Sequence, residues 1–149
     1  MFKHILLPTD GSKLSVKAVK KAIQLAKSVG AKVTAVNITP QFEWRMTDES
    51  FAVPAPAAYR KRYEEEAAKG SKKLLDEVRT EAQAAGVECE GVTVISDVPY
   101  AAIIKLATKA KCDLIVMASH GRRGISGILL GSETTKVLTH STIPVLVVR

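Results

Sequence analysis

The residues best suited to chemistry follow a short apolar run, 114–118. Within the next residues lie four glycines and a serine that opens a helical pattern: Gly121, Gly124, Gly127, Gly131 and Ser132. Glycine has no side chain, so successive backbone N–H groups can approach an anion, and the first turn of the next helix adds N–H groups without partners. The spacing indicates a phosphate-binding loop between a strand and a helix. The alternative is that the glycines serve only a tight turn.

A second polar segment, Pro8-Thr9-Asp10, closes the first apolar run of the chain. Parallel sheets bind ligands beyond the carboxyl ends of their strands, where the strand order reverses. If the first strand lies between the second and the fourth, this segment faces residues 118–121. The Asp10 carboxylate could then accept hydrogen bonds from a ribose, or steer phosphates through Mg²⁺. A plain helix cap is the alternative interpretation of Asp10.

The elements that would position these segments alternate between strand and helix patterns. Apolar, β-branched runs predict strands, and apolar residues recurring every three or four positions predict amphipathic helices. Strands are expected at 4–9, 32–39, 87–96, 114–118 and 143–149, and helices at 12–29, 59–85, 100–110 and 132–140. Because crossover connections are right-handed and make neighbouring strands parallel, we predict a Rossmann-like α/β fold. It would be a single domain, 1–149, with four helices flanking an open parallel five-stranded sheet in three layers, in the strand order 3-2-1-4-5.

The helical periodicity also predicts which side chains face the sheet. The expected inward residues are Val16, Val19, Ile23 and Ala26 in the first helix; Tyr63, Ala67, Gly70, Leu74, Val78, Ala82 and Ala85 in the second; and Ala101, Ile104 and Ala107 or Thr108 in the third.

Composition and charge limit the class of protein. The formal net charge is +7, and residues 1–40 carry most of the excess, with seven lysines against one aspartate. Five of these lysines lie on the outer face of the first helix, without the arginines and aromatic residues that nucleic-acid binding favours. We therefore expect a solvated face and no nucleic-acid partner. No apolar run approaches the roughly 20 residues that span a bilayer, and the first is cut short by Pro8, so we expect a cytoplasmic protein without a membrane segment.

Three further features of the sequence each carry a prediction. Cys89 and Cys112 are far apart in sequence and outside any metal-binding pattern, so both are expected to be buried thiols. Residues 40–58 hold three prolines and the only tryptophan, and we interpret them as a mobile loop, a lid or an interface segment. The final apolar strand, 143–149, leaves a sheet edge to be covered, which predicts a homodimer through this strand.

The segment MASHGRRGISGILLGS resembles the nucleotide motif of the universal stress protein family, in which two glycines and a Gly-Ser or Gly-Thr pair surround bound ATP. Gly121, the nine residues after it, and Gly131-Ser132 match this motif. Ala118 stands where the family motif begins with glycine. LLPTDGS, SDVPYAAI and STIPVLVV are also similar to family segments, in the expected order, so the resemblance covers the whole chain.

The resemblance implies a site for ATP, or another adenine nucleotide, together with Mg²⁺. Pro8, Thr9 and Asp10 would line the adenosine end, with Ile38 against the base and Met117 and Ala118 beside the ribose. The phosphates would be held, chiefly by backbone, at His120, Gly121, Gly131, Ser132 and Glu133. Arg122 and Arg123 could reach phosphate oxygens, although loop arginines are commonly solvated.

Three functions stay open from the sequence. The first is a nucleotide-responsive stress regulator that holds ATP and acts as a dimer through a downstream partner of unknown identity. The second is a partner-binding module of the same fold that has lost the nucleotide, a reading that Ala118 favours. The third is an enzyme that hydrolyses ATP slowly, which neither a GxSxG segment nor a P-loop lysine supports.

Overall fold

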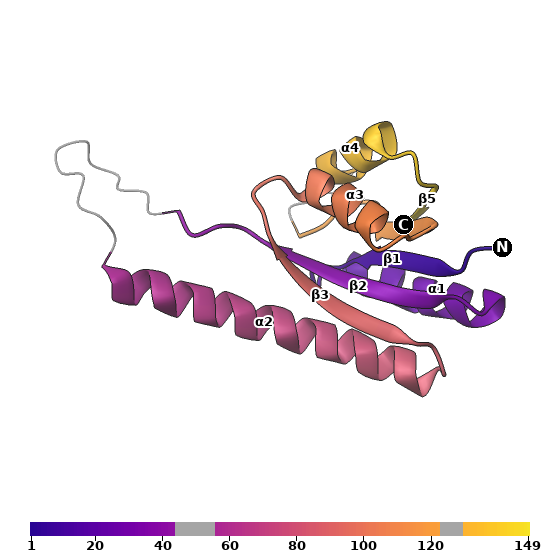
Figure 1. Ribbon diagram of the computed structural model, residues 1–149, viewed down its shortest axis with the longest axis horizontal. Helices are drawn as coiled ribbons and strands as arrows, with labels where there is room; N and C mark the ends of the chain where they lie inside the picture. The colour runs from indigo at the N-terminus through magenta and orange to yellow at the C-terminus, as the bar shows by residue number, and fades with distance from the viewer. Residues whose placement is uncertain (44–55, 123–129) are drawn as a thin grey trace.

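The computed structural model describes residues 1–43, 56–122 and 130–149. Strands and helices alternate through them: β1 (His4–Pro8), α1 (Lys13–Val29), β2 (Lys32–Thr39), α2 (Ala57–Ala84), β3 (Cys89–Ile95), α3 (Pro99–Lys109), β4 (Leu114–Ala118), α4 (Ser132–His140) and β5 (Val145–Val148). The strands form one sheet in the order β3-β2-β1-β4-β5, and every neighbouring pair is parallel (Figure 1). The predicted fold class and strand order are confirmed.

The helices cover both faces of the sheet, α1 and α2 on one side and α3 and α4 on the other (Figure 1). Because successive side chains of a strand point to opposite faces, β1 sends Ile5 and Leu7 towards α1 and α2, and Leu6 towards α3 and α4. All three of these side chains are fully buried. Burial on both faces explains why the central strands read as continuous apolar runs rather than alternating ones.

Two inward helix faces begin with a serine, which the apolar periodicity did not predict. Ser15 of α1 is buried and its hydroxyl lies 2.5 Å from that of Thr9. Ser71 of α2 is also buried, with its hydroxyl 2.7 Å from that of Thr93 in β3. A hydroxyl pair satisfies both polar groups, so a serine can occupy an inward position.

The structure confirms the predicted inward positions of Val19, Ile23 and Ala26 in α1, Val78 and Ala82 in α2 and Ala107 in α3, but other predicted positions differ. Val16, predicted to face the sheet, is 40% exposed, and the buried residues of α1 are Ser15, Ala18, Val19, Ala22, Ile23 and Ala26. In α2 the buried residues are Ser71, Leu75, Val78 and Ala82, so the prediction of Gly70 and Leu74 was wrong by one position. In α3 they are Ile103 and Ala107, not Ala101 or Ile104.

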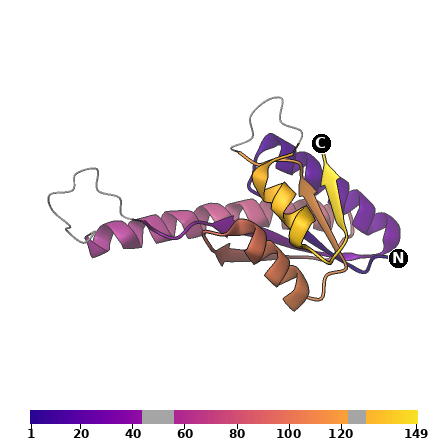
Figure 2. The ribbon, with the colours of Figure 1, turned by 90° about the horizontal axis from the view of Figure 1, so that it is seen from above.

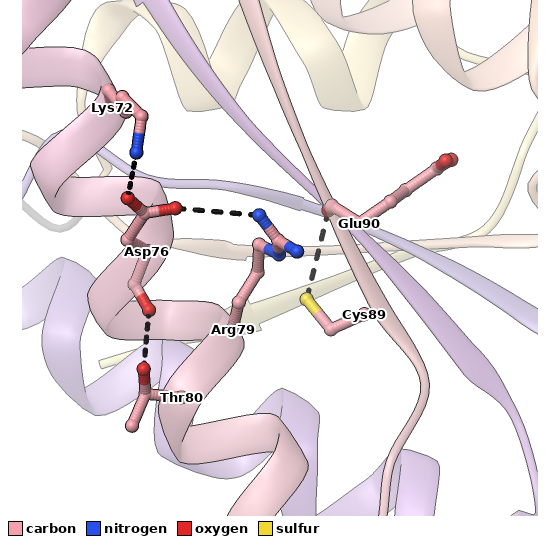
Figure 3. A network of polar contacts seen from close by, with 6 residues as sticks. All are labelled: Lys72, Asp76, Arg79, Thr80, Cys89 and Glu90. Atoms are coloured by element: carbon pink, nitrogen blue, oxygen red, sulfur yellow. Dashed lines mark hydrogen bonds and ion pairs between the residues drawn. The ribbon is translucent and has the colours of Figure 1, made fainter.

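Helix α2 is long, and its first half extends beyond the sheet in both views (Figures 1 and 2). Its charged side chains pair along the helix, and Asp76 contacts both Lys72 and Arg79, at 2.5 and 3.4 Å (Figure 3). By contrast, the described part of the chain shows no ion pair for the lysines of α1. The local excess of positive charge on α1 therefore stays uncompensated within the described residues.

The loop predicted at 40–58 is shorter than expected at its end. Helix α2 begins at Ala57, so residues 57–58 are helical. Residues 44–55 of the predicted loop lie outside the described residues. Cys89 is partly exposed and Cys112 buried, and both are free thiols. Within the described ranges, no helix is long and apolar enough to cross a bilayer.

Candidate functional site

The Asp10 carboxylate joins the loop after β1 to the loop after β4. One oxygen accepts the backbone N–H of Ser12 and the other accepts that of Arg122, each at 2.9 Å. The side-chain N-cap of α1 is Ser12, whose hydroxyl accepts the N–H of Ser15 at 3.2 Å. The interpretation of Asp10 as a plain helix cap is therefore wrong, since its second oxygen holds a loop 112 residues away.

Gly121 and Gly131 are required by close packing. Neither has a positive φ, unlike Gly11, Gly30 and Gly86. A Cβ atom on Gly121 would overlap the Asp10 carboxylate, and one on Gly131 would lie 2.9 Å from the Cβ of His120. Real Cβ atoms essentially never lie this close to a neighbouring atom, so a side chain at either position would force its neighbour to shift. Gly121 therefore lets the loop after β4 approach Asp10 in the loop after β1, and Gly131 lets the start of α4 approach His120 just after β4.

Helix α4 begins directly at this packing point. Gly131 is its N-cap, with its N–H donated to the carbonyl of Ser119 at 2.7 Å. No side chain in the described residues caps this helix end. The first turn of α4 therefore presents backbone N–H groups without side-chain acceptors, which is the usual arrangement at an anion site.

Buried hydroxyl and amide groups that the sequence interpretation missed hold the strand ends in place. The side chain of Asn37 donates to the carbonyl of Thr9 at 2.9 Å, and Thr9 in turn pairs with Ser15. Across the sheet, the Thr134 hydroxyl donates to the carbonyl of Ala118 at 3.0 Å. The sequence signal for these contacts was a polar residue at a position where the strand or helix pattern expects an apolar one.

Five further residues of the predicted site are wholly or partly buried. Thr9 is 6% exposed and Met117 is 6% exposed, with Met117 packed in the core beneath α3 and α4, so ligand contacts from Met117 would have to come from its backbone. Ala118 is 8% exposed at the end of β4. Pro8 and Ile38 are partly buried, the latter against the same core as Met117.

Three polar side chains lie around the loop after β4. His120 is partly buried, with its Nδ1 3.3 Å from the hydroxyl of Ser119. Arg122 turns its guanidinium towards Gly11, where an added Cβ atom would lie 3.2 Å from Nη2. Ser132 is exposed at the start of α4. Arg123 lies outside the described residues.

The Glu133 side chain points away from the α4 turn. Its Oε2 accepts the backbone N–H of Tyr100 at 2.8 Å, and its Oε1 lies 3.1 Å from the ammonium of Lys136. The carboxylate therefore caps α3, and only the backbone of Glu133 is left facing the predicted phosphate position.

The described residues contain no group of three His, Cys, Asp or Glu side chains that could hold a metal by themselves. Asp10 offers a single carboxylate, whose oxygens already accept two N–H groups. This donor set fits Mg²⁺ only as a companion of phosphate oxygens, because Mg²⁺ is commonly bound by one or two carboxylates together with substrate phosphates. The hollow along α2 is lined by residues of that helix alone, and one helix cannot surround a ligand.

Comparison with known proteins identifies the family of this fold and site. The family model described as "Universal stress protein family" matches residues 1–149. The chain belongs to the universal stress protein family. Universal stress protein MJ0531 of Methanocaldococcus jannaschii is 34% identical over 158 residues, which cover 100% of this chain and 83% of the relative.

Solved universal stress protein structures show the same architecture. The structure of protein MJ0577, from the same organism, superposes with a TM-score of 0.82 at 26% identity and covers 99% of this chain and 96% of that one. A universal stress protein crystallised in complex with cAMP superposes with a TM-score of 0.68 at 28% identity, covering 99% of this chain and 97% of its own. The family resemblance expected from the glycine motif is confirmed.

Proposed function

We infer that this universal stress protein binds an adenine nucleotide, ATP with Mg²⁺, between the carboxyl ends of β1 and β4, and acts as a nucleotide-responsive regulator. The observation that carries this proposal is the contact of Asp10 with Gly121 and Arg122, which joins the two loops, together with Gly131, which packs the uncapped start of α4 against His120. The cAMP complex of a relative at 28% identity supports an adenine ligand.

The adenosine end would lie along Pro8, Thr9 and Asp10, with Ile38 against the base and the backbone of Met117 and Ala118 beside the ribose. The phosphates would meet the backbone at His120, Gly121, Gly131, Ser132 and Glu133. Arg122 would supply a positive charge near the phosphates, since its guanidinium lies beside Gly11, next to the contact between Asp10 and the loop after β4. Bound Mg²⁺ would neutralise part of the phosphate charge, and the Asp10 carboxylate would be its protein partner at this site.

Isothermal titration of the purified protein with ATP and Mg²⁺ tests the proposal directly. We expect a dissociation constant in the micromolar range, equivalent to about −8 kcal/mol. Mass spectrometry of nucleotide released from the purified protein identifies which adenine ligand is retained. Absence of heat at about 100 µM ATP, with no retained nucleotide, would remove the support for binding at this affinity.

The proposed regulator is a homodimer through residues 143–149. Within the described residues β5 pairs only with β4, so it forms an edge of the sheet, and Leu146 on it is 42% exposed. A second β5 would cover the unpaired backbone groups and this side chain together. Analytical ultracentrifugation at about 50 µM should give twice the monomer mass, because a dimer with a dissociation constant of a few micromolar is mostly assembled at that concentration.

A nucleotide-free, partner-binding module is the second candidate, and one observation favours it. Ala118 adds a methyl group where the family motif has glycine, at a position only 8% exposed. A protein that purifies without nucleotide and fails to bind any, yet stays dimeric, would support this candidate. Slow hydrolysis of ATP is a third possibility that a turnover assay with His120→Ala would assess.

A further inference from the structure

Glu133 connects the start of α4 to the start of α3. Helix α3 has Val98 as its N-cap, which offers no side-chain acceptor, and Pro99 as its first residue. The next N–H, that of Tyr100, is satisfied from the other helix by the Glu133 carboxylate at 2.8 Å. A carboxylate carried by the first turn of α4 therefore lies at the positive end of α3.

A compact polar group surrounds this link. Lys136, one turn along α4, lies 3.1 Å from the second oxygen of Glu133 and 5.5 Å from the ring centre of Tyr100. The ring of His140 lies 5.2 Å from that of Tyr100, and its Nδ1 is 2.8 Å from the carbonyl of Lys136. A shift of the Glu133 carboxylate therefore changes the surroundings of Tyr100 directly.

We propose that Glu133 is a positioning residue that transmits phosphate occupancy at the start of α4 to the first turn of α3. This rests on the proposed function, because it requires an anion beside the Gly131–Ser132 turn. A phosphate held by the first N–H groups of α4 repels the Glu133 carboxylate through like charge. Because the carboxylate already contacts the Tyr100 N–H and Lys136, this repulsion favours the capped arrangement over any in which the carboxylate turns back to its own helix, so an occupied turn strengthens the cap on α3.

Amide hydrogen exchange at Tyr100, with and without saturating ATP and Mg²⁺, tests the link. We expect exchange of this amide to slow by about threefold on binding, and by less with AMP, because AMP carries fewer charges. Glu133→Gln keeps an acceptor for the N–H but removes the charge. It should abolish the nucleotide-dependent change at Tyr100 while binding ATP about two- to fivefold tighter, since the like charge is gone.

Glu77→Gln is the matched control, because it removes a carboxylate from an exposed position on α2, away from α3 and α4. It should leave both the affinity and the Tyr100 response as in the parent protein. Circular dichroism verifies that each variant is folded.

The outcomes separate this proposal from the proposed function. If calorimetry shows binding but exchange at Tyr100 does not change, the link is wrong and the nucleotide site stands. The same conclusion follows if Glu133→Gln keeps the full response. If no adenine nucleotide binds, both proposals fall together, and the calorimetric trace alone distinguishes that case.

Discussion

The Asp10 carboxylate accepts the backbone N–H of Arg122 at 2.9 Å, and Asp113 makes the corresponding link at the other end of the same two strands. Asp113, which directly precedes β4, accepts the N–H groups of Lys3 and His4 at 2.8 and 3.0 Å. Each end of the β1–β4 pair is thus closed by one aspartate that accepts two backbone N–H groups. Only the Asp10 end carries the glycine loop, so the pair provides an internal control.

Asp10→Asn and Asp113→Asn should have similar effects on stability and different effects on binding. Asparagine keeps one acceptor but turns an NH₂ group towards the second N–H, so each variant should lose about 1–3 kcal/mol of unfolding free energy. We expect only Asp10→Asn to weaken ATP binding, by about tenfold, because it releases the loop after β4. Urea denaturation and calorimetry give the two quantities. Equal losses of affinity would mean that Asp10 acts only through global stability.

Gly131→Ala should disrupt the joint between the loop after β4 and α4. The added methyl group meets the Cβ of His120 at 2.9 Å, so the helix start must shift, at a cost of about 1–3 kcal/mol, and nucleotide binding should be lost. Gly70→Ala is the matched control, because a Cβ atom there has no neighbour within 4 Å. In mid-helix it should raise the unfolding free energy by about 1 kcal/mol and leave binding unchanged. A Gly131→Ala variant with parental affinity would contradict the proposed site.

Ala118→Gly restores the glycine with which the family motif begins. It should leave ATP affinity unchanged or raise it, because it permits closer backbone approach to a ligand. Since the methyl group is buried and glycine is more flexible when unfolded, the variant should lose about 1 kcal/mol of unfolding free energy. Calorimetry and thermal denaturation measure the two effects. A marked fall in affinity would show that the methyl group contributes to the site.

Protonation of His4 should make stability depend on pH. His4 is 7% exposed, its Nε2 lies 2.7 Å from the Thr34 hydroxyl, and that hydroxyl donates to Glu90 at 2.7 Å. Burial, followed by the charge of Lys32, lowers the pKa of His4 below 6.5, against smaller opposing effects that include Glu90 and Asp113. The unfolded chain therefore takes up this proton at a higher pH than the folded chain.

The consequence is that unfolding becomes more favourable as the pH falls through about 6.5 towards the lower folded value, and this contribution is constant above about pH 7. His4→Gln should flatten the fall in stability measured by urea denaturation between about pH 7 and 5. An unchanged slope in His4→Gln would assign the pH dependence to other groups.

The fold could be predicted because apolar runs and glycine or proline stops mark every element of the sheet. Residues such as Ser15, Ser71 and Asn37 could not, since their inward positions depend on partners contributed by distant strands. The Glu133 contact with Tyr100 was missed for the same reason, because it joins two helices 33 residues apart. The motif predicted Glu133 beside a phosphate, but its carboxylate caps another helix.

The separation between Asp10 and Arg122 also orders events during synthesis of the chain. Residues 8–12 leave the ribosome early, whereas the first turn of α4 follows only after α1, α2 and α3 with their strands. A ligand held by both segments can select only molecules in which β4 has already inserted beside β1. If nucleotide binds as proposed, nascent chains stalled before about residue 133 should gain no stability from it, whereas the finished chain should be stabilised by mass action.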